Sequence, residues 1–169
     1  MRRDRPAPSL TAVVIGVGNP YRLDDGVGPA VIDLLREAGL PGEVLAESDG
    51  EVSQLLHLWT GADLAVVVDA VRVRDPVPGR VHRRELSGLS RPGASTATSH
   101  AVDLGEAVAL GRALDRLPGT LVCYAVEVEQ TGFGRGLTPP VRAAAQALAS
   151  TIGALLAADA DPAADRSRR

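Results

Sequence analysis

Two kinds of hydrophobic pattern alternate along this chain. Short runs that are mostly apolar predict strands at residues 11–17, 63–70 and 120–127, and residues 43–47 predict a second, shorter strand. Longer segments with apolar residues at helical spacing predict helices, and they cover residues 26–38, 51–59, 101–117 and 139–157. The run at 63–70 has Val, Leu and Ala at nearly every position, which is typical of a parallel strand covered on both faces.

A different pattern occurs at residues 80–86, where polar and apolar residues alternate as in a half-exposed edge strand. The strand–helix–strand–helix–strand order before it predicts right-handed crossovers and a parallel sheet. We therefore expect an α/β fold of three layers (α/β/α). Its twisted sheet would have about five strands, mostly parallel with one antiparallel edge strand, and helices on both faces.

The two ends of the chain differ in composition from its middle. Residues 1–10 are charged and contain Pro, and residues 158–169 are rich in Ala, Asp, Pro and Arg. We expect a flexible arm at 1–10, a single domain at 11–157 and a disordered tail at 158–169. The segment 87–99 is rich in Ser, Thr, Gly and Pro and is longer than a connector needs to be, as functional loops often are. In the helix that follows it, the spacing predicts that Leu104, Val108 and Leu114 point inward.

Composition narrows the class of protein. The chain has 169 residues, of which 45% are hydrophobic but only 2% are aromatic, so Val, Leu, Ala and Ile must form the core. A net charge of -3 argues against a nucleic-acid binder. The single cysteine, Cys123, excludes an internal disulfide and a cysteine zinc cluster. No apolar run suggests a membrane span and the start lacks a signal-peptide core, so we expect a soluble cytoplasmic protein.

Polar residues follow the predicted strands at the points where each one ends. Asn19 and Asp25 follow the first strand, Asp49 follows the second, Asp69 ends the third, and His100 opens a helix. Ligands of open α/β sheets bind at the carboxyl ends of the strands. The topology therefore predicts that these side chains converge at one edge.

Each of these residues also has a purely structural explanation. Asp25 and Asp49 precede helices, where Asp is a favoured N-cap, and His100 can face water at a helix start. Asp69 is hardest to explain in this way, because a charge at the end of a buried strand must be paired, hydrated or liganded. Of the adjacent carboxylates, Asp24 is expected to be structural or solvated, whereas Asp25 can be either a helix cap or a site residue.

Other candidates for chemistry are weaker. His57 is predicted to face solvent, His82 to decorate the edge strand, and Cys123 to lie in the core. The chain has no G-x-S-x-G around a serine, no complete G-x-G-x-x-G and no G-K-[ST]. These absences disfavour an α/β serine hydrolase, a dinucleotide-binding protein and a P-loop protein.

Two carboxylates and one imidazole allow two kinds of chemistry. They can hold a divalent transition metal, with nickel or zinc suited to such a ligand set, and leave positions open for water or a partner's group. Alternatively, a carboxylate can activate water for peptide hydrolysis with no bound ion. The residues themselves leave this choice open.

Four segments, in order, resemble the nickel-iron hydrogenase maturation endopeptidases. They are V-I-G-V-G-N-P-Y-R-L-D-D-G-V-G at 14–28, G-A-D-L-A-V-V-V-D-A-V at 61–71, T-S-H-A-V-D-L at 98–104 and Y-A-V-E-V-E-Q with G-L-T-P-P-V at 124–141. The first is similar to the family's G-x-G-N and D-[DE]-x-x-G signature. The others are similar to its D-A-V, S-x-H and E-P-E…G-L-S-P-x-V elements. Together the resemblance spans about residues 11–157.

The resemblance implies a function. The family removes a C-terminal extension from the precursor of the hydrogenase large subunit after nickel insertion. Its metal-contacting residues correspond to Asp25, Asp69 and His100, with Asn19 and Asp49 in support, and its nickel is thought to belong to the substrate. We therefore expect nickel as the metal, the large-subunit precursor as partner, and neither nucleic acid nor membrane.

The chain departs from the family pattern at two places. Asp49-Gly50-Glu51-Val52 stands where the family has D-G-G-T, and Val128 replaces the Pro of E-P-E. Two other functions compete with the protease. One is a non-catalytic nickel-sensing assembly module that docks on the large subunit, and the other is a generic metal-dependent hydrolase.

Overall fold

The computed structural model describes residues 11–87 and 101–159. The predicted arm at 1–10 and most of the predicted loop and tail lie outside these residues, and so does His100.

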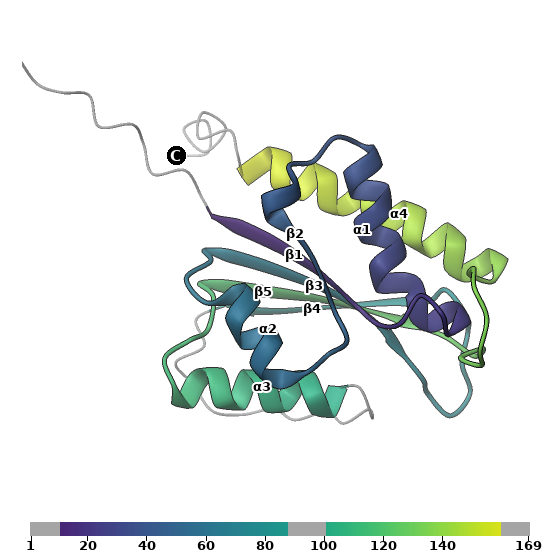
Figure 1. The fold of residues 1–169 in the computed structure, drawn as a ribbon, viewed down its shortest axis with the longest axis horizontal. Coiled ribbons are helices and arrows are strands. Elements are labelled where there is room, and N and C mark those ends of the chain that lie inside the picture. The colour runs from purple at the N-terminus through teal and green to yellow at the C-terminus, as the bar shows by residue number, and fades with distance from the viewer. Residues whose placement is uncertain (1–10, 88–100, 160–169) are drawn as a thin grey trace, which may run out of the picture.

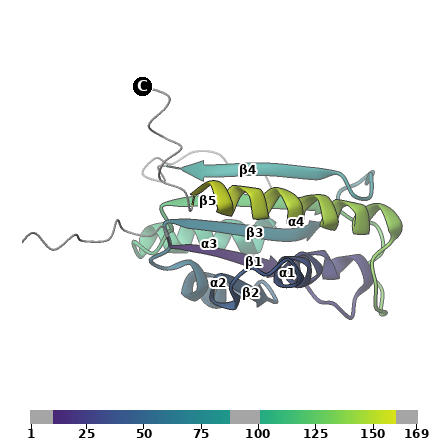
Figure 2. The same ribbon diagram turned by 90° about the horizontal axis from the view of Figure 1, so that it is seen from above.

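A single five-stranded sheet forms the centre of the described structure, with the strand order β2-β1-β3-β5-β4. Its neighbours are parallel except for β4, which runs antiparallel to β5 at one edge (Figures 1 and 2). The predicted α/β sheet with one antiparallel edge strand is therefore confirmed. The strands are β1 (Ala12–Val17), β2 (Leu45–Ser48), β3 (Leu64–Val71), β4 (Val81–Ser87) and β5 (Thr120–Glu127).

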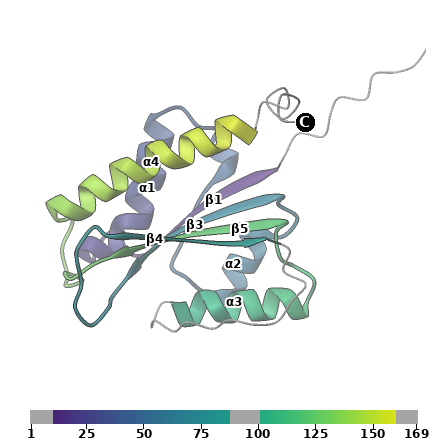
Figure 3. The same cartoon turned by 180° about the vertical axis from the view of Figure 1, so that it is seen from behind.

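Helices cover both faces of the sheet, as predicted. Helices α1 (Val27–Glu37) and α4 (Pro139–Asp159) lie on one face, and α2 (Val52–Trp59) and α3 (Ala101–Ala113) lie on the other (Figures 1 and 3). Alternate residues of each central strand therefore enter two separate hydrophobic clusters. Val66 and Val68 belong to the α1–α4 cluster, whereas Ala65 and Val67 belong to the α2–α3 cluster.

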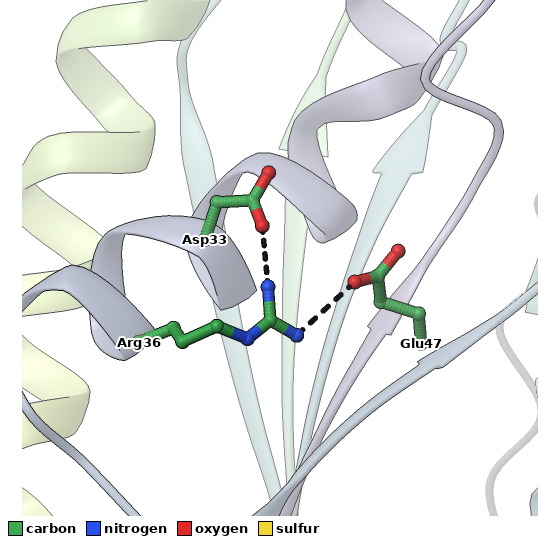
Figure 4. A network of polar contacts seen from close by, with 3 residues as sticks. All are labelled: Asp33, Arg36 and Glu47. Carbon is green, nitrogen blue, oxygen red and sulfur yellow. Dashed lines mark hydrogen bonds and ion pairs between the residues drawn. The ribbon is translucent and has the colours of Figure 1, made fainter. Parts of the chain in front are cut away.

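Glycines allow α1 to start directly on the sheet. A Cβ atom on Gly28 would lie 2.2 Å from the Val17 carbonyl oxygen and 2.7 Å from that of Val68. A Cβ on Gly16 would lie 2.4 Å from the Gly28 carbonyl oxygen. The first turn of α1 is thereby placed against the carboxyl ends of β1 and β3. Farther along α1, Arg36 bonds Asp33 at 2.5 Å and Glu47 of β2 at 3.4 Å (Figure 4).

The structure differs from the sequence prediction in local details. The second strand begins at Leu45 rather than 43, because Gly42–Val44 form a 3-10 turn. Leu114 is 52% exposed and not inward, since α3 ends at Ala113, whereas Ala107 of that helix is fully buried. Helix α4 continues through Asp159, so the predicted tail cannot begin at 158.

The expectation that no segment resembles a membrane span is wrong by length and composition. The stretch Pro139–Ala158 has 20 residues and a mean hydropathy of 1.4, so it is long enough and apolar enough to cross a membrane. In the fold, however, its inward residues Val141, Ala145, Leu148 and Ile152 are buried in the core cluster against α1 and the sheet. Packing of this kind is typical of a core helix.

Candidate active site

The loop after β1 folds back on itself at Gly18. This residue has a φ of +135°, and its N–H donates to the Ser48 carbonyl oxygen at 3.0 Å. A Cβ here would lie 1.9 Å from the carbonyl oxygen of Asp25, so only glycine permits the contact. The turn brings the end of β1 against the pair of aspartates, as its glycines suggest.

Asp25 faces the turn that precedes it. Its Oδ2 atom accepts the Asn19 backbone N–H at 3.0 Å, and the side chain is largely buried, with the residue 9% exposed. Asn19 in turn orients the loop, because its Oδ1 accepts the Tyr21 N–H at 2.9 Å. Neither the 3-10 turn Leu23–Gly26 nor α1 has a side-chain cap, so the capping explanation for Asp25 is wrong. Within the described residues Oδ1 of Asp25 has no hydrogen-bond partner.

The carboxylate of Asp24, in contrast, makes hydrogen bonds that hold two loops together. It is fully buried, and its Oδ1 and Oδ2 accept the N–H and hydroxyl of Thr138 at 2.7 and 2.9 Å. Its own N–H donates to the Gln130 carbonyl oxygen at 3.0 Å. Asp24 therefore ties the first loop to the loop between β5 and α4, in agreement with its predicted supporting role.

Asp69 lies at the same edge of the sheet. The last paired row of β1 and β3 is Gly16 with Val68, so Asp69 is the first β3 residue beyond that pairing. It is half-buried, and its Oδ1 accepts the Ala70 N–H at 2.8 Å. Because the start of α1 contacts Val68, the Asp25 loop and Asp69 belong to one end of the molecule.

The remaining predicted site residues have different outcomes. His100 lies outside the described residues, directly before α3. Asp49 is exposed and accepts the Glu51 N–H at 3.1 Å. It does not cap α2, because Glu51 is the N-cap and accepts the N–H groups of Ser53 and Gln54. In residues 11–87 and 101–159, no three His, Cys, Asp or Glu side chains gather as a metal site.

One buried carboxylate at this edge was missed by sequence reasoning. Glu127, the last residue of β5, is 2% exposed, and its carboxylate accepts the Val77 N–H at 2.7 Å. It also pairs with His82 Nε2 at 2.7 Å and with Arg80 at 3.5 Å. The Val77 and His82 hydrogen bonds hold the pKa of Glu127 below its ordinary value of 4.5. A charge that ends a buried strand, the pattern already noted for Asp69, was the available signal.

Cys123, predicted to lie in the core, is partly buried at the edge of a core cluster. It packs against the α2–α3 cluster, and burial together with the nearby Asp69 charge raises its pKa to about 12. Such a thiol stays protonated near neutral pH and is a poor nucleophile. His57 is exposed on α2, as predicted. The chemistry of this edge therefore rests on carboxylates.

The aspartates of this α/β domain lie at the carboxyl edge of a parallel sheet. This edge is where α/β proteins commonly bind ligands and carry out catalysis. Comparison with protein-family models matches residues 32–154 to the HycI model, described as hydrogenase maturation protease. The chain therefore belongs to the hydrogenase maturation protease family, and it is a maturation endopeptidase by class.

Solved structures of such proteases share the fold. The hydrogenase maturating endopeptidase HybD from E. coli is 21% identical, with a TM-score of 0.69 over 86% of this chain and 91% of that one. The hydrogenase 2 maturation peptidase from Thaumarchaeota archaeon SCGC_AB-539-E09 is 25% identical, with a TM-score of 0.61 over 86% and 97%. HybD from Thermococcus kodakarensis is 20% identical, with a TM-score of 0.62 over 86% and 99%. Comparison with curated protein sequences gives no significant match.

Proposed function

We propose that this chain removes a C-terminal extension from the precursor of a nickel-iron hydrogenase large subunit after nickel has been inserted. The observation that carries the proposal is Asp25. Its carboxylate is held by the Asn19 N–H through one oxygen, while the other has no partner in the described residues, at the edge that Asp69 shares. Family membership supplies the reaction class.

Asp25, Asp69 and His100 are the residues we assign to the site. Two carboxylates and an imidazole suit a divalent nickel ion, and three protein ligands leave positions for groups of the precursor. We regard nickel as part of the substrate, read by these side chains. When bound, it would polarise a carbonyl group or lower the pKa of a water molecule.

The reaction itself is hydrolysis of one peptide bond. A carboxylate accepts a proton from water, the water oxygen attacks the scissile carbonyl carbon, and the proton passes to the leaving amine as the carbon–nitrogen bond breaks. Asp25 is the candidate base, which makes the protease aspartic in type. Asn19 positions Asp25 through the 3.0 Å hydrogen bond, and Asp49 stays a candidate for support from the neighbouring loop.

The proposed setting is the cytoplasm, with the large-subunit precursor as partner and without nucleic acid or membrane. The net charge of -3 offers no excess of cations for phosphate, and the apolar helix α4 packs one face against the core.

Purified chain incubated with nickel-loaded precursor tests the function. We expect mass spectrometry to show the precursor losing its C-terminal extension. Asp25→Asn, Asp69→Asn and His100→Ala should each lower the rate by about 100-fold or more. Asp33→Asn is the matched control, because Asp33 is an exposed carboxylate that, within the described part of the chain, pairs with Arg36 on the same helix, and this variant should process at the wild-type rate.

The same incubation separates the competing functions. Stable binding without loss of mass would favour the nickel-sensing assembly module. Tight metal binding by the isolated chain, with turnover of small peptides, would favour a generic metal-dependent hydrolase. Wild-type rates in all three site variants would refute the residue assignment.

A further inference from the structure

Some aromatic side chains of this protein are buried in the core, and the others are exposed on two neighbouring loops. The chain has one Trp, two Tyr and one Phe. Trp59 and Tyr124 are buried, whereas Tyr21 is 59% exposed and Phe133 is 96% exposed. The exposed pair lies on two loops that run beside each other, since the N–H of Gly134 donates to the Tyr21 carbonyl oxygen at 2.9 Å.

These two loops are held together by a network of backbone contacts. Arg22 and Gly134 form a parallel bridge, and the Leu23 N–H donates to the Gly134 carbonyl oxygen at 3.1 Å. Leu23 adopts a φ of +48°, which is uncommon for a leucine and costs free energy that the surrounding contacts must offset. The Thr138 bonds to buried Asp24 close the far side of the network. The aromatic pair is therefore presented on a preorganised support.

Cationic side chains flank the aromatic pair. The Arg135 guanidinium lies 4.7 Å from the centre of the Tyr21 ring, within cation–π distance. Arg22 is also exposed, and its Nε donates to the Thr131 carbonyl oxygen at 3.3 Å. Exposed aromatic and arginine side chains on a rigid support are the composition of interaction hot spots.

We infer that Tyr21, Phe133 and Arg135 form a docking surface for the folded body of the large-subunit precursor. The inference rests on the proposed function. Residues 21–23 lead directly into Asp24 and Asp25, and the Asn19 N–H that holds the Asp25 carboxylate lies two positions before Tyr21, so a protein that delivers its C-terminal peptide to Asp25 comes close to this loop. The surface fits a partner with an apolar recess for Phe133 and carboxylates around it for the arginines.

Binding of the nickel-loaded precursor, measured by biolayer interferometry together with cleavage kinetics, tests this inference. Phe133→Ala and Arg135→Ala should each raise Kd by about 10-fold. The KM should rise in parallel while kcat stays within about twofold, because neither side chain touches the reacting atoms. Phe133→Trp should restore binding. Leu114→Ala is the control: Leu114 is 52% exposed, yet it follows α3 at the opposite end of the strands, so Kd should not change.

The outcomes separate the surface from the function. If the wild-type chain cleaves the precursor and the variants bind it with unchanged Kd, the docking surface is wrong and the protease stands. A fall in kcat with unchanged Kd would mean that the loop shapes the site instead, which also overturns the inference. If the wild-type chain does not cleave, the protease fails, and Kd alone then supports or refutes the surface. Absence of any binding refutes both.

Discussion

Two neighbouring aspartates with the same chemistry have different environments in this protein. Asp24 is fully buried and receives both donors of Thr138, while Asp25 keeps one carboxylate oxygen without a partner in the described residues. The difference comes from Thr138, which is 114 positions away in the chain. The fold therefore separates a structural carboxylate from a candidate catalytic one at consecutive positions.

Replacing Asp24 by Asn should lower stability. The substitution keeps the shape but turns one acceptor oxygen into an amide NH2 that faces a donor, so a buried hydrogen bond is lost. We expect the free energy of unfolding to fall by about 2–3 kcal/mol in urea titrations. The control Asp33→Asn, on an exposed helix face, should change it by less than about 0.5 kcal/mol. Equal losses in the two variants would contradict the role of Asp24.

Glu127 should make stability depend on pH. Hydrogen bonds from Val77 and His82 place its folded pKa below its ordinary value of 4.5, which we take for the unfolded chain. Its contribution is therefore fully present above pH 4.5 and is lost as the pH falls through the folded pKa. Glu127→Gln should be less stable than wild type by about 1–3 kcal/mol at pH 7, and the gap should narrow below pH 4.5. Thermal unfolding of both proteins between pH 7 and pH 3 measures the gap. A gap that stays constant over this range would be inconsistent with this linkage.

At the scale of elements, the site depends on how closely the first turn of α1 approaches the sheet. Gly28 lies against the carbonyl oxygens of Val17 and Val68, at the ends of β1 and β3. The residue after Val68 is Asp69, and Asp25 lies three positions before Gly28. One helix–sheet contact therefore sets the positions of both carboxylates.

Gly28→Ala should disturb stability and the site together. The added Cβ would lie 2.2 Å from backbone, which cannot yield as a flexible side chain can, so α1 must move away from the sheet. We expect a loss of about 2 kcal/mol or more in urea unfolding, with reduced cleavage of the precursor. Gly153→Ala in α4 is the control: nothing lies within 4 Å of its Cβ, and alanine should stabilise that helix by up to about 1 kcal/mol. A Gly28→Ala protein as stable and active as wild type would refute the contact's importance.

The elements that sequence predicted well are those whose signal is local. Strand β5 was predicted at its exact bounds and β3 within one residue, because continuous apolar runs mark buried strands. The errors occur where distant or competing contacts decide. Glu51 caps α2 although Asp is the more common cap. The Glu127–Val77 hydrogen bond joins residues 50 positions apart, so no local pattern could reveal it.

For the candidate site, the sequence predicts the family and the edge of the sheet where the site lies, but not the hydrogen bonds and burial of its side chains. The positions of Asp25 and Asp69 at the carboxyl ends of β1 and β3 follow from the topology alone. The hydrogen bond from Asn19 that holds Asp25, and the burial of Asp24, require the folded loop. Convergence of His100 with these carboxylates stays a prediction.

At the scale of the whole molecule, the two hydrophobic clusters leave the carboxyl edge of the sheet to the loops. Tyr21, Asp24 and Thr138 belong to loops that bind one another there, while the cores of α1–α4 and α2–α3 lie on the two faces. Loops that bind one another at an accessible edge are suited to a large protein substrate, which needs such an edge more than a deep pocket.

Nickel should act as part of the precursor and not as a resident cofactor. We propose that Asp25, Asp69 and His100 contact the ion together with groups of the precursor, so the free chain alone should bind nickel only weakly. Nickel at a concentration equal to a weak Kd would stabilise the free chain by only about 0.4 kcal/mol, a Tm shift of about 1 °C. A resident site occupied at 100 times its Kd would give about 2.7 kcal/mol and a shift of several degrees.

Differential scanning fluorimetry measures nickel binding by the free chain, and a cleavage assay measures how strongly the reaction depends on nickel in the precursor. We expect nickel or EDTA to move the Tm of the free chain by less than about 2 °C, and nickel-free precursor to be cleaved at least about 100-fold more slowly than nickel-loaded precursor. Asp69→Asn should abolish that preference by slowing the nickel-loaded reaction, since it removes a proposed nickel contact. A Tm that falls by several degrees in EDTA, with equal cleavage of both precursors, would instead place the metal in the enzyme and make this edge a conventional metalloprotease site.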